Sequence, residues 1–140
     1  MAVGYSGTPL QKKLGLKAPM QLVVVDAPIE YDSIVGQLPQ DVSLGCAAGK
    51  STGMVHVFAT SRATLSDHLV KLRGQLGDEA AIWVSWPKKA SKVPTDITED
   101  TIRELALPLG FVDIKVCAVS EVWSGLKLVV RKGLRGGGAA

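Results

Sequence analysis

The sequence predicts a single α/β domain whose mostly parallel sheet has about six strands, helices on both faces and an antiparallel hairpin at its C-terminal end. Short valine-rich runs are typical of strands buried on both sides, and they alternate with stretches of helical spacing. The last two strand patterns follow each other with no helix between them. A length of 140 residues with 46% hydrophobic residues is enough to fill one core.

The first half of the chain is expected to supply three strands and the first helices. A short helix opens at Thr8, which can cap it, and residues 21–27 follow as a valine-rich strand. A second short helix is predicted over residues 29–38, and residues 42–47 form a weaker strand. The run MVHVFA at residues 54–59 indicates another strand buried on both faces.

A long amphipathic helix is predicted next, capped by Thr60 or Ser61. Its leucines recur at spacings of four, three and four residues and therefore share one face, and Gly77 follows where a terminal glycine is favoured. The run AAIWVSW at residues 80–86 predicts a strand that Pro87 ends. A polar loop containing lysines comes after it.

The last third of the chain predicts one more helix and the final hairpin. Thr98 caps the helix, and the acidic residues of its first turn favour the positive end of the helix dipole. A strand is predicted over residues 111–119, a turn over 121–125 and a returning strand over 126–131. Side chains alternate between the two faces of a strand. In the strand over residues 111–119, one face is expected to carry Val112, Ile114, Val116 and Ala118, and the other Asp113, Lys115 and Cys117.

Strands that alternate with helices give a Rossmann-like sheet. The domain is expected to span residues 1–131, followed by a disordered glycine-rich tail at 132–140. No apolar run approaches the roughly 20 residues that cross a membrane, and residues 1–8 lack the pattern of a secretory signal. Both cysteines lie in apolar surroundings and are interpreted as buried free thiols, so the cytoplasm is the expected location.

Three stretches carry a family resemblance over nearly the whole chain. They read YSGTPLQKKLGLK at residues 5–17, WVSWPKKASKVPTD at 83–96 and KVCAVSEVWSGLKLVVRK at 115–132. These segments resemble a family of small bacterial proteins known as domain of unknown function three-thousand-and-fifty-two. That resemblance implies a bacterial cytoplasmic protein and carries no known activity. The order of elements, with Gly110–Phe111 leading into a strand that a final strand pairs with in reverse, resembles a trimmed class I methyltransferase fold.

The methyltransferase resemblance implies S-adenosylmethionine, but the expected cofactor-binding pattern is missing. Such sheets use a glycine-rich turn after the first strand and a carboxylate at the end of the second. Here the first strand is followed by Asp-Ala-Pro-Ile-Glu at residues 26–30, and the second ends in Gly-Cys-Ala-Ala at residues 45–48. The third strand of the usual fold is also missing. We therefore expect a scaffold without that site and predict no cofactor.

Other motifs are weaker. Residues 45–52, GCAAGKST, are one residue short of a phosphate-binding loop and precede a strand instead of a helix, so we interpret them as a turn with a solvated Lys50. His56 and His68 are interpreted as histidines paired with their surroundings. No cysteine–histidine spacing fits a metal site, and no acid–base pair is evident, so we assign no metal ligand and no catalytic residue.

Candidate ligand-binding residues lie where the strands of a parallel sheet end, because open sheets of this kind bind ligands at the carboxyl ends of their strands. A tryptophan beside two lysines can stack on a planar ring while the lysines meet an anion. The same chemistry recurs in the predicted hairpin turn. The candidates are Asp26, Glu30, Thr60, Ser61, Arg62, Trp86, Lys88 and Lys89, with Trp123, Ser124 and Lys127 from the turn.

Three functions remain open on the sequence. We favour a non-catalytic binding or interaction module whose partner is another protein or a second copy at an exposed sheet edge. The first alternative is a binder of a small anionic ligand or nucleotide at the strand ends, and the second is a divergent S-adenosylmethionine-dependent methyltransferase. A net charge of +3 and 5% aromatic residues do not favour a nucleic-acid partner, and no membrane partner is expected.

Overall fold

The computed structural model describes residues 20–29, 31, 42–45 and 47–131. Within them, six strands form one sheet in the order β2-β1-β3-β4-β6-β5. The expected helix at Thr8, most of the expected helix over residues 29–38, and the tail at 132–140 lie outside this part of the chain. The strands are β1 (Met20–Val25), β2 (Val42–Gly45), β3 (Met54–Phe58), β4 (Ala81–Pro87), β5 (Phe111–Ala118) and β6 (Trp123–Val130).

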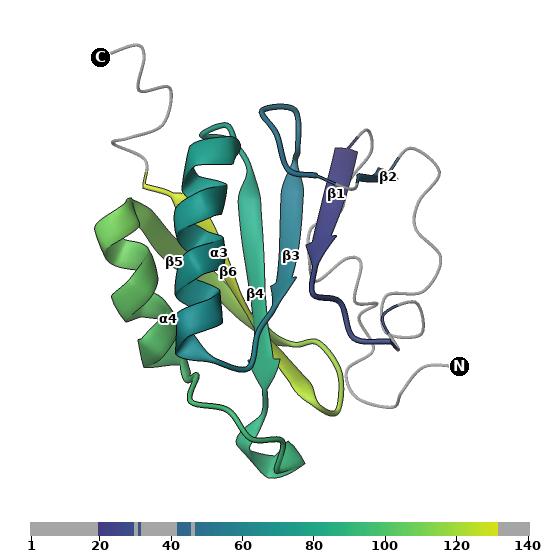
Figure 1. The fold of residues 1–140 in the computed structure, drawn as a ribbon, viewed down its shortest axis with the longest axis vertical. Helices are drawn as coiled ribbons and strands as arrows, with labels where there is room; N and C mark the ends of the chain where they lie inside the picture. Colours follow the sequence, from purple (N-terminus) through teal and green to yellow (C-terminus); the bar gives the residue numbers. More distant parts are fainter. Residues whose placement is uncertain (1–19, 30, 32–41, 46, 132–140) are drawn as a thin grey trace.

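The predicted α/β, Rossmann-like class is confirmed. β1 pairs in parallel with β2 and β3, and β3 pairs in parallel with β4. β6 runs antiparallel to both neighbours and lies between β4 and β5, so the C-terminal hairpin is part of the same sheet (Figure 1). The helices α3 (Arg62–Gln75) and α4 (Glu99–Ala106) both cover the same face of the sheet.

The core has two parts because each strand presents alternate residues to opposite faces. Under α3 and α4, Val55 and Val57 of β3 pack against buried leucines of α3. On the other face, Leu22, Phe58 and Trp83 form a second cluster with Tyr31. No helix of the described segments is long and apolar enough to cross a membrane.

The helix caps follow the sequence. The Ser61 hydroxyl accepts a hydrogen bond from the backbone N–H of Thr64, which is the bond an N-cap residue makes. Thr98 caps α4 and exchanges hydrogen bonds with Thr101 in a capping box. The last turn tightens into a 3-10 helix at Leu107–Leu109, and Gly110 ends it with a φ of 96°.

The hairpin differs from the prediction in two ways. A β-bulge at Ile114 inserts one residue between Asp113, opposite Leu128, and Lys115, opposite Lys127. The alternation therefore changes face there, and Val112 does not share a face with Val116 and Ala118, as the sequence predicted. In addition, β6 begins at Trp123 instead of after a turn at 121–125.

Gly74 in α3 offers a simple test of this fold. It lies in the last turn of the helix, and apart from its chain neighbours and the backbone of its own helix nothing lies within 4 Å of where a Cβ would be, so Gly74→Ala is expected to raise the free energy of unfolding by about 0.5 kcal/mol. Urea unfolding measures the change. Gly125→Ala is the matched control with the opposite sign, because a Cβ there would lie 2.8 Å from Val119 Cγ2. A Gly74→Ala variant that is less stable would contradict the placement of α3.

Candidate functional site

The carboxyl ends of β1, β3 and β4 meet at one edge of the sheet. β1 lies between β2 and β3, so the chain turns to opposite sides of β1 at this point. Open α/β sheets bind their ligands in the crevice beside such a switch point. The residues that follow the strands here are Asp26 after β1, Ala59 and Thr60 after β3, and Lys88 after β4.

A small cavity of about 180 Å³ lies at the switch point between β1 and β3. Four parts of the fold supply its walls: the end of β1, the end of β3, the first turn of α3 and the start of β6. The residues lining it are Asp26, Phe58, Ala59, Thr60, Thr64 and Trp123.

A hydrogen bond between two side chains holds the end of β1 against α3. The Asp26 carboxylate accepts a hydrogen bond from His68 Nε2 at 2.8 Å, with the two side chains 58% and 22% exposed. Asp26 also has a φ of 56°, in the left-handed region that glycine favours and aspartate tolerates. His68 lines a second cavity, of about 300 Å³, together with Lys71 and Gln75. The pair therefore lies between two cavities.

Three buried side chains, Tyr31, His56 and Ser85, are linked by hydrogen bonds behind the switch-point cavity. His56 is fully buried, with its Nε2 2.7 Å from Ser85 Oγ and its Nδ1 3.3 Å from Tyr31 Oη. Its ring stacks on Phe58 with the centroids 4.3 Å apart. Burial lowers the pKa of His56 to about 3, so the ring is neutral at pH 7. Ser85 is also fully buried, so this serine–histidine pair has no access for a substrate.

The end of β4 borders a larger cavity of about 530 Å³. The first turn of α4 and the loop before it form the facing wall, and Arg103 from the same helix reaches into the lining. The lining residues are Trp86, Pro87, Lys89, Thr95, Ile97, Thr98, Glu99, Asp100 and Arg103.

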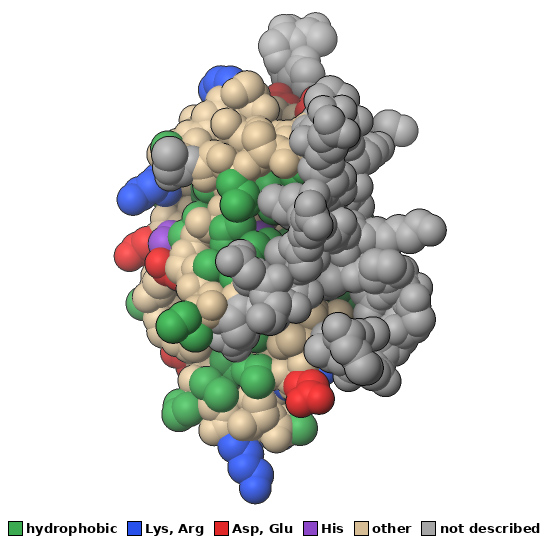
Figure 2. Space-filling view, turned by 90° about the vertical axis from the view of Figure 1, so that its right-hand side faces the viewer, with side chains coloured by type: hydrophobic (Ala, Val, Ile, Leu, Met, Phe, Trp, Pro, Cys, Tyr) green, Lys and Arg blue, Asp and Glu red, His purple; other side chains and the backbone are tan. Residues whose placement is uncertain are grey.

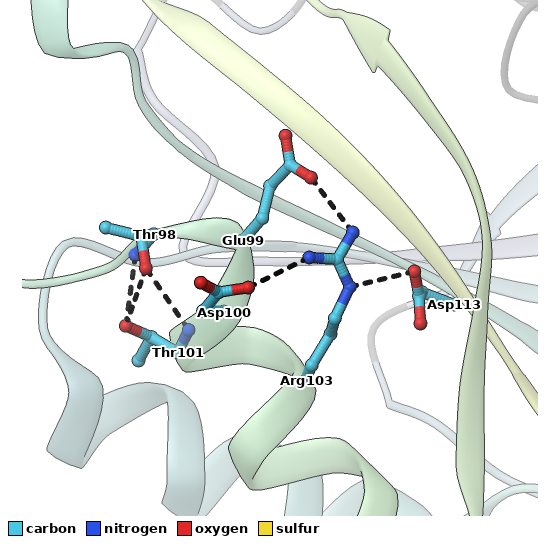
Figure 3. A network of polar contacts seen from close by, with 6 residues as sticks. All are labelled: Thr98, Glu99, Asp100, Thr101, Arg103 and Asp113. Carbon is cyan, nitrogen blue, oxygen red and sulfur yellow. Dashed lines mark hydrogen bonds and ion pairs between the residues drawn. The ribbon is translucent and has the colours of Figure 1, made fainter.

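Carboxylates already bind Arg103 beside this larger cavity. Its Nη2 contacts Glu99 at 3.0 Å, its Nη1 contacts Asp100 at 3.1 Å, and its Nε contacts Asp113 at 3.0 Å (Figure 3). Hydrogen bonds to Asp113 and Glu99 raise the pKa of Arg103 above its ordinary value. Since three carboxylates already surround this guanidinium, it is poorly placed to bind an added anion.

The structure separates the predicted site residues into two groups. Asp26, Thr60 and Trp123 line the switch-point cavity, while Trp86 and Lys89 line the larger one. The two predicted clusters adjoin, because Trp123 pairs with Pro87 and the Lys88 N–H donates to Val122 O at 2.6 Å. Trp86, however, is only 7% exposed and packs in the core under α3 and α4, so its ring is not the open stacking surface the sequence predicted.

The remaining candidates have structural partners or lie elsewhere. Ser61 caps α3, and the Arg62 guanidinium pairs with Glu104 at 2.8 Å. Ser124 and Lys127 both belong to strand β6, which corrects the turn predicted for Ser124 and agrees with the strand predicted over residues 126–131 for Lys127. The Lys127 ammonium lies 5.9 Å from the ring centroid of Trp83. Glu30 falls outside the described residues.

The described residues of the loop that resembles a phosphate-binding motif bond to other parts of this chain. The Lys50 ammonium donates to Leu76 O at 3.2 Å, at the C-terminal end of α3, where a positive charge is favourable. The Thr52 hydroxyl donates to Gln21 Oε1 at 2.7 Å. The loop leads into β3, as predicted, and so lacks the helix N-terminus that a phosphate loop uses.

The far edge of the sheet carries exposed apolar side chains. Figure 2 looks onto the side formed by β1 and β2, where hydrophobic side chains of the described residues reach the surface. Leu44 of β2 is 59% exposed, and Ile29, which follows β1, is fully exposed. Across the described segments, no group of three or more histidine, cysteine, aspartate or glutamate side chains is arranged to hold a metal ion.

Comparisons with known proteins agree with this geometry. The model of the family described as Protein of unknown function (DUF3052) matches residues 51–132. No protein with a curated description matches the chain.

Among solved structures, a SAM-dependent methyltransferase from Aquifex aeolicus is similar, with a TM-score of 0.60, 14% identity, and coverage of 86% of this chain and 87% of that one. Ribosomal protein L11 methylase from Lactobacillus delbrueckii subsp. bulgaricus gives a TM-score of 0.56 and 12% identity over 86% of this chain and 74% of that one. A protein of the NADB-Rossmann superfamily from Streptococcus agalactiae gives a TM-score of 0.53 and 11% identity, with coverage of 89% of this chain and 68% of that one. At such identities the likeness is one of fold.

Proposed function

Since the chain belongs to the family described as Protein of unknown function (DUF3052) and has the fold of class I methyltransferases, we propose that it is a non-catalytic binding or interaction module on a methyltransferase-like scaffold. One observation carries this proposal: at the switch point, the chain's own Asp26–His68 pair joins the end of β1 to α3. A cofactor-binding sheet leaves this place to a glycine-rich turn.

The residues at the switch point do not fit S-adenosylmethionine. The turn after β1 reads Asp26-Ala27-Pro28 and contains no glycine that would let the backbone approach a ligand. The switch-point cavity, at about 180 Å³, is smaller than the roughly 300 Å³ at which sites for drug-sized ligands such as S-adenosylmethionine begin. A carboxylate at the end of the second strand would hold the ribose hydroxyls of the cofactor. Residues 45–48, at the end of that strand, include no aspartate or glutamate.

The alternative of an anionic ligand has weaker support. The larger cavity holds Lys89, but Glu99 and Asp100 line the same space, and Arg103 is already bound to carboxylates. An anion would face this acidic wall. Two cysteines in 140 residues are too few for a disulfide scaffold, which supports placing the protein in the cytoplasm.

The edge strand β5 is a poor place for another strand to add. Ile114 and Val116 are 55% and 49% exposed, which is an apolar surface a partner could use. The bulge at Ile114, however, interrupts the strand, and Lys115 beside it is exposed. Natural edge strands use both devices to avoid pairing with other chains. Compared with β5, the carboxyl edge of the sheet is the better candidate for recognition.

Titration with S-adenosylmethionine tests the proposal. We expect no saturable heat in calorimetry and no rise in Tm at about 1 mM cofactor, whereas a ligand at 100 times its Kd would stabilise the fold by about 2.7 kcal/mol. S-adenosylhomocysteine and ATP with magnesium are titrated in parallel. The double variant Lys88→Ala with Lys89→Ala tests whether any ATP binding depends on these two lysines. Saturable 1:1 binding of either adenosyl compound would overturn the proposal in favour of a divergent methyltransferase.

A further inference from the structure

The switch-point cavity has the charge of a cation site. Asp26 is the one charged residue among the described residues that line it, and no lysine or arginine shares that lining. The two threonines add hydroxyl groups, and the other walls are apolar or aromatic. The larger cavity differs, because lysine and arginine line it together with its carboxylates.

Two aromatic rings stand at a right angle beside that carboxylate. The centroids of Phe58 and Trp123 lie 5.0 Å apart with an interplanar angle of 88°. The electron-rich faces of aromatic rings attract cations, and tryptophan does so most strongly. A carboxylate combined with aromatic walls is the chemistry that recognises quaternary and methylated ammonium groups.

Asp26 has capacity left for a ligand. Its Oδ2 accepts the bond from His68, which fixes the side chain, and its carboxylate stays 58% exposed. A carboxylate accepts about four hydrogen bonds, so one bond to an imidazole does not saturate it. Asp26 also sits in the left-handed region, where glycine would be less strained. A charged side chain kept at such a backbone position is consistent with a role for that side chain.

The cavity volume limits the size of the ligand. At about 180 Å³, the cavity is well below the roughly 300 Å³ at which sites for drug-sized ligands begin. A head group of about five non-hydrogen atoms, such as a nitrogen bearing four carbons, matches this space. A nucleoside does not.

We propose that the switch-point cavity binds a small organic ammonium group, with the Asp26 carboxylate facing its charge and the partly buried Trp123 ring, which packs against the buried Phe58, covering its carbons. This inference rests on the proposed function, because it names the ligand class for the binding module. A quaternary or methylated ammonium is the best match, since it needs charge and aromatic contact but few directed hydrogen bonds.

Tetramethylammonium chloride is the probe, titrated into the full chain at constant ionic strength and followed by ¹H–¹⁵N NMR. We expect saturable shifts at the amides of Ala59, Thr60 and Thr64 and at the Trp123 indole N–H. tert-Butanol has the same number of non-hydrogen atoms and no charge, and it is expected to bind at least about tenfold more weakly. Equal binding of the two compounds would overturn the proposal, because the cavity would then recognise shape alone.

Two variants locate the site. Asp26→Asn tolerates the left-handed backbone and removes the charge, so it is expected to weaken tetramethylammonium binding by about tenfold. Asp67→Asn, an exposed carboxylate on α3 outside the cavity, is the matched control and is expected to bind like the natural chain. Trp123→Leu is expected to weaken binding as well, and it gives an independent reading should Asp26→Asn fold poorly.

Three results contradict the inference: no saturable shifts at the cavity, shifts confined to Glu99 and Asp100, or an Asp26→Asn affinity equal to that of Asp67→Asn. Each of them leaves the S-adenosylmethionine result unchanged. A failure of the ligand assignment is thus distinguishable from a failure of the proposed function.

Discussion

Between pH 6.5 and 5, the free energy of unfolding is expected to fall by up to about 1.4 kcal/mol per pH unit, because His56 stays neutral in the fold. Its pKa is lowered from 6.5 to about 3 by burial. In this window the unfolded chain binds a proton that the folded chain does not. The contribution of the neutral His56 ring to the free energy of unfolding is therefore fully present above pH 6.5. It is lost progressively as the pH falls toward 3.

Urea unfolding at pH 7 and pH 5 measures this effect. We expect a loss of up to about 2 kcal/mol over that interval, and above pH 5 the surface carboxylates contribute little to it. His56→Gln has no titrating ring and is expected to have a nearly flat profile over the same interval, at a lower overall stability. An unchanged stability at pH 5 in the natural chain would contradict a neutral, buried His56.

Most of the fold was predictable because its signals are local. The valine-rich runs of β1 and β3 are too short for helices, and the leucine spacing of α3 is helical. Ser61 and Thr98 cap their helices through contacts within three residues. Each of these features depends on neighbours in sequence, so the sequence contains enough to predict it.

The features that the sequence did not predict depend on distant partners. The Asp26–His68 pair joins residues 42 apart, and neither residue shows its partner in a local pattern. The bulge at Ile114 is set by the register against β6, and alternation within β5 cannot reveal it. Burial of Trp86, by contrast, had a signal. A strand buried on both faces buries every residue, including a tryptophan near its end.

Replacing Trp83 by alanine is expected to cost about 3–5 kcal/mol of unfolding free energy. Trp83 is fully buried in the central strand β4 and is among the largest side chains of the core. Its ring lies against Gly125 of β6, where a Cβ would be only 3.2 Å from Trp83 Cε3. Since Gly125 has no side chain that could fill the space, the cavity cannot collapse well, which favours the upper part of this range. Urea or thermal unfolding at pH 7 measures the loss.

Two further variants separate the parts of that loss. Lys127→Met keeps the aliphatic stem over the ring and removes the ammonium 5.9 Å from its centroid, so it is expected to cost only about 0.5–1 kcal/mol. Gly125→Ala destabilises the natural chain but is expected to cost less in the Trp83→Ala background, because the space beside it is then open. If the losses of unfolding free energy from Trp83→Ala and Gly125→Ala simply add in the double variant, the Trp83 ring and Gly125 do not pack against each other. That result would contradict the packing between β4 and β6 described above.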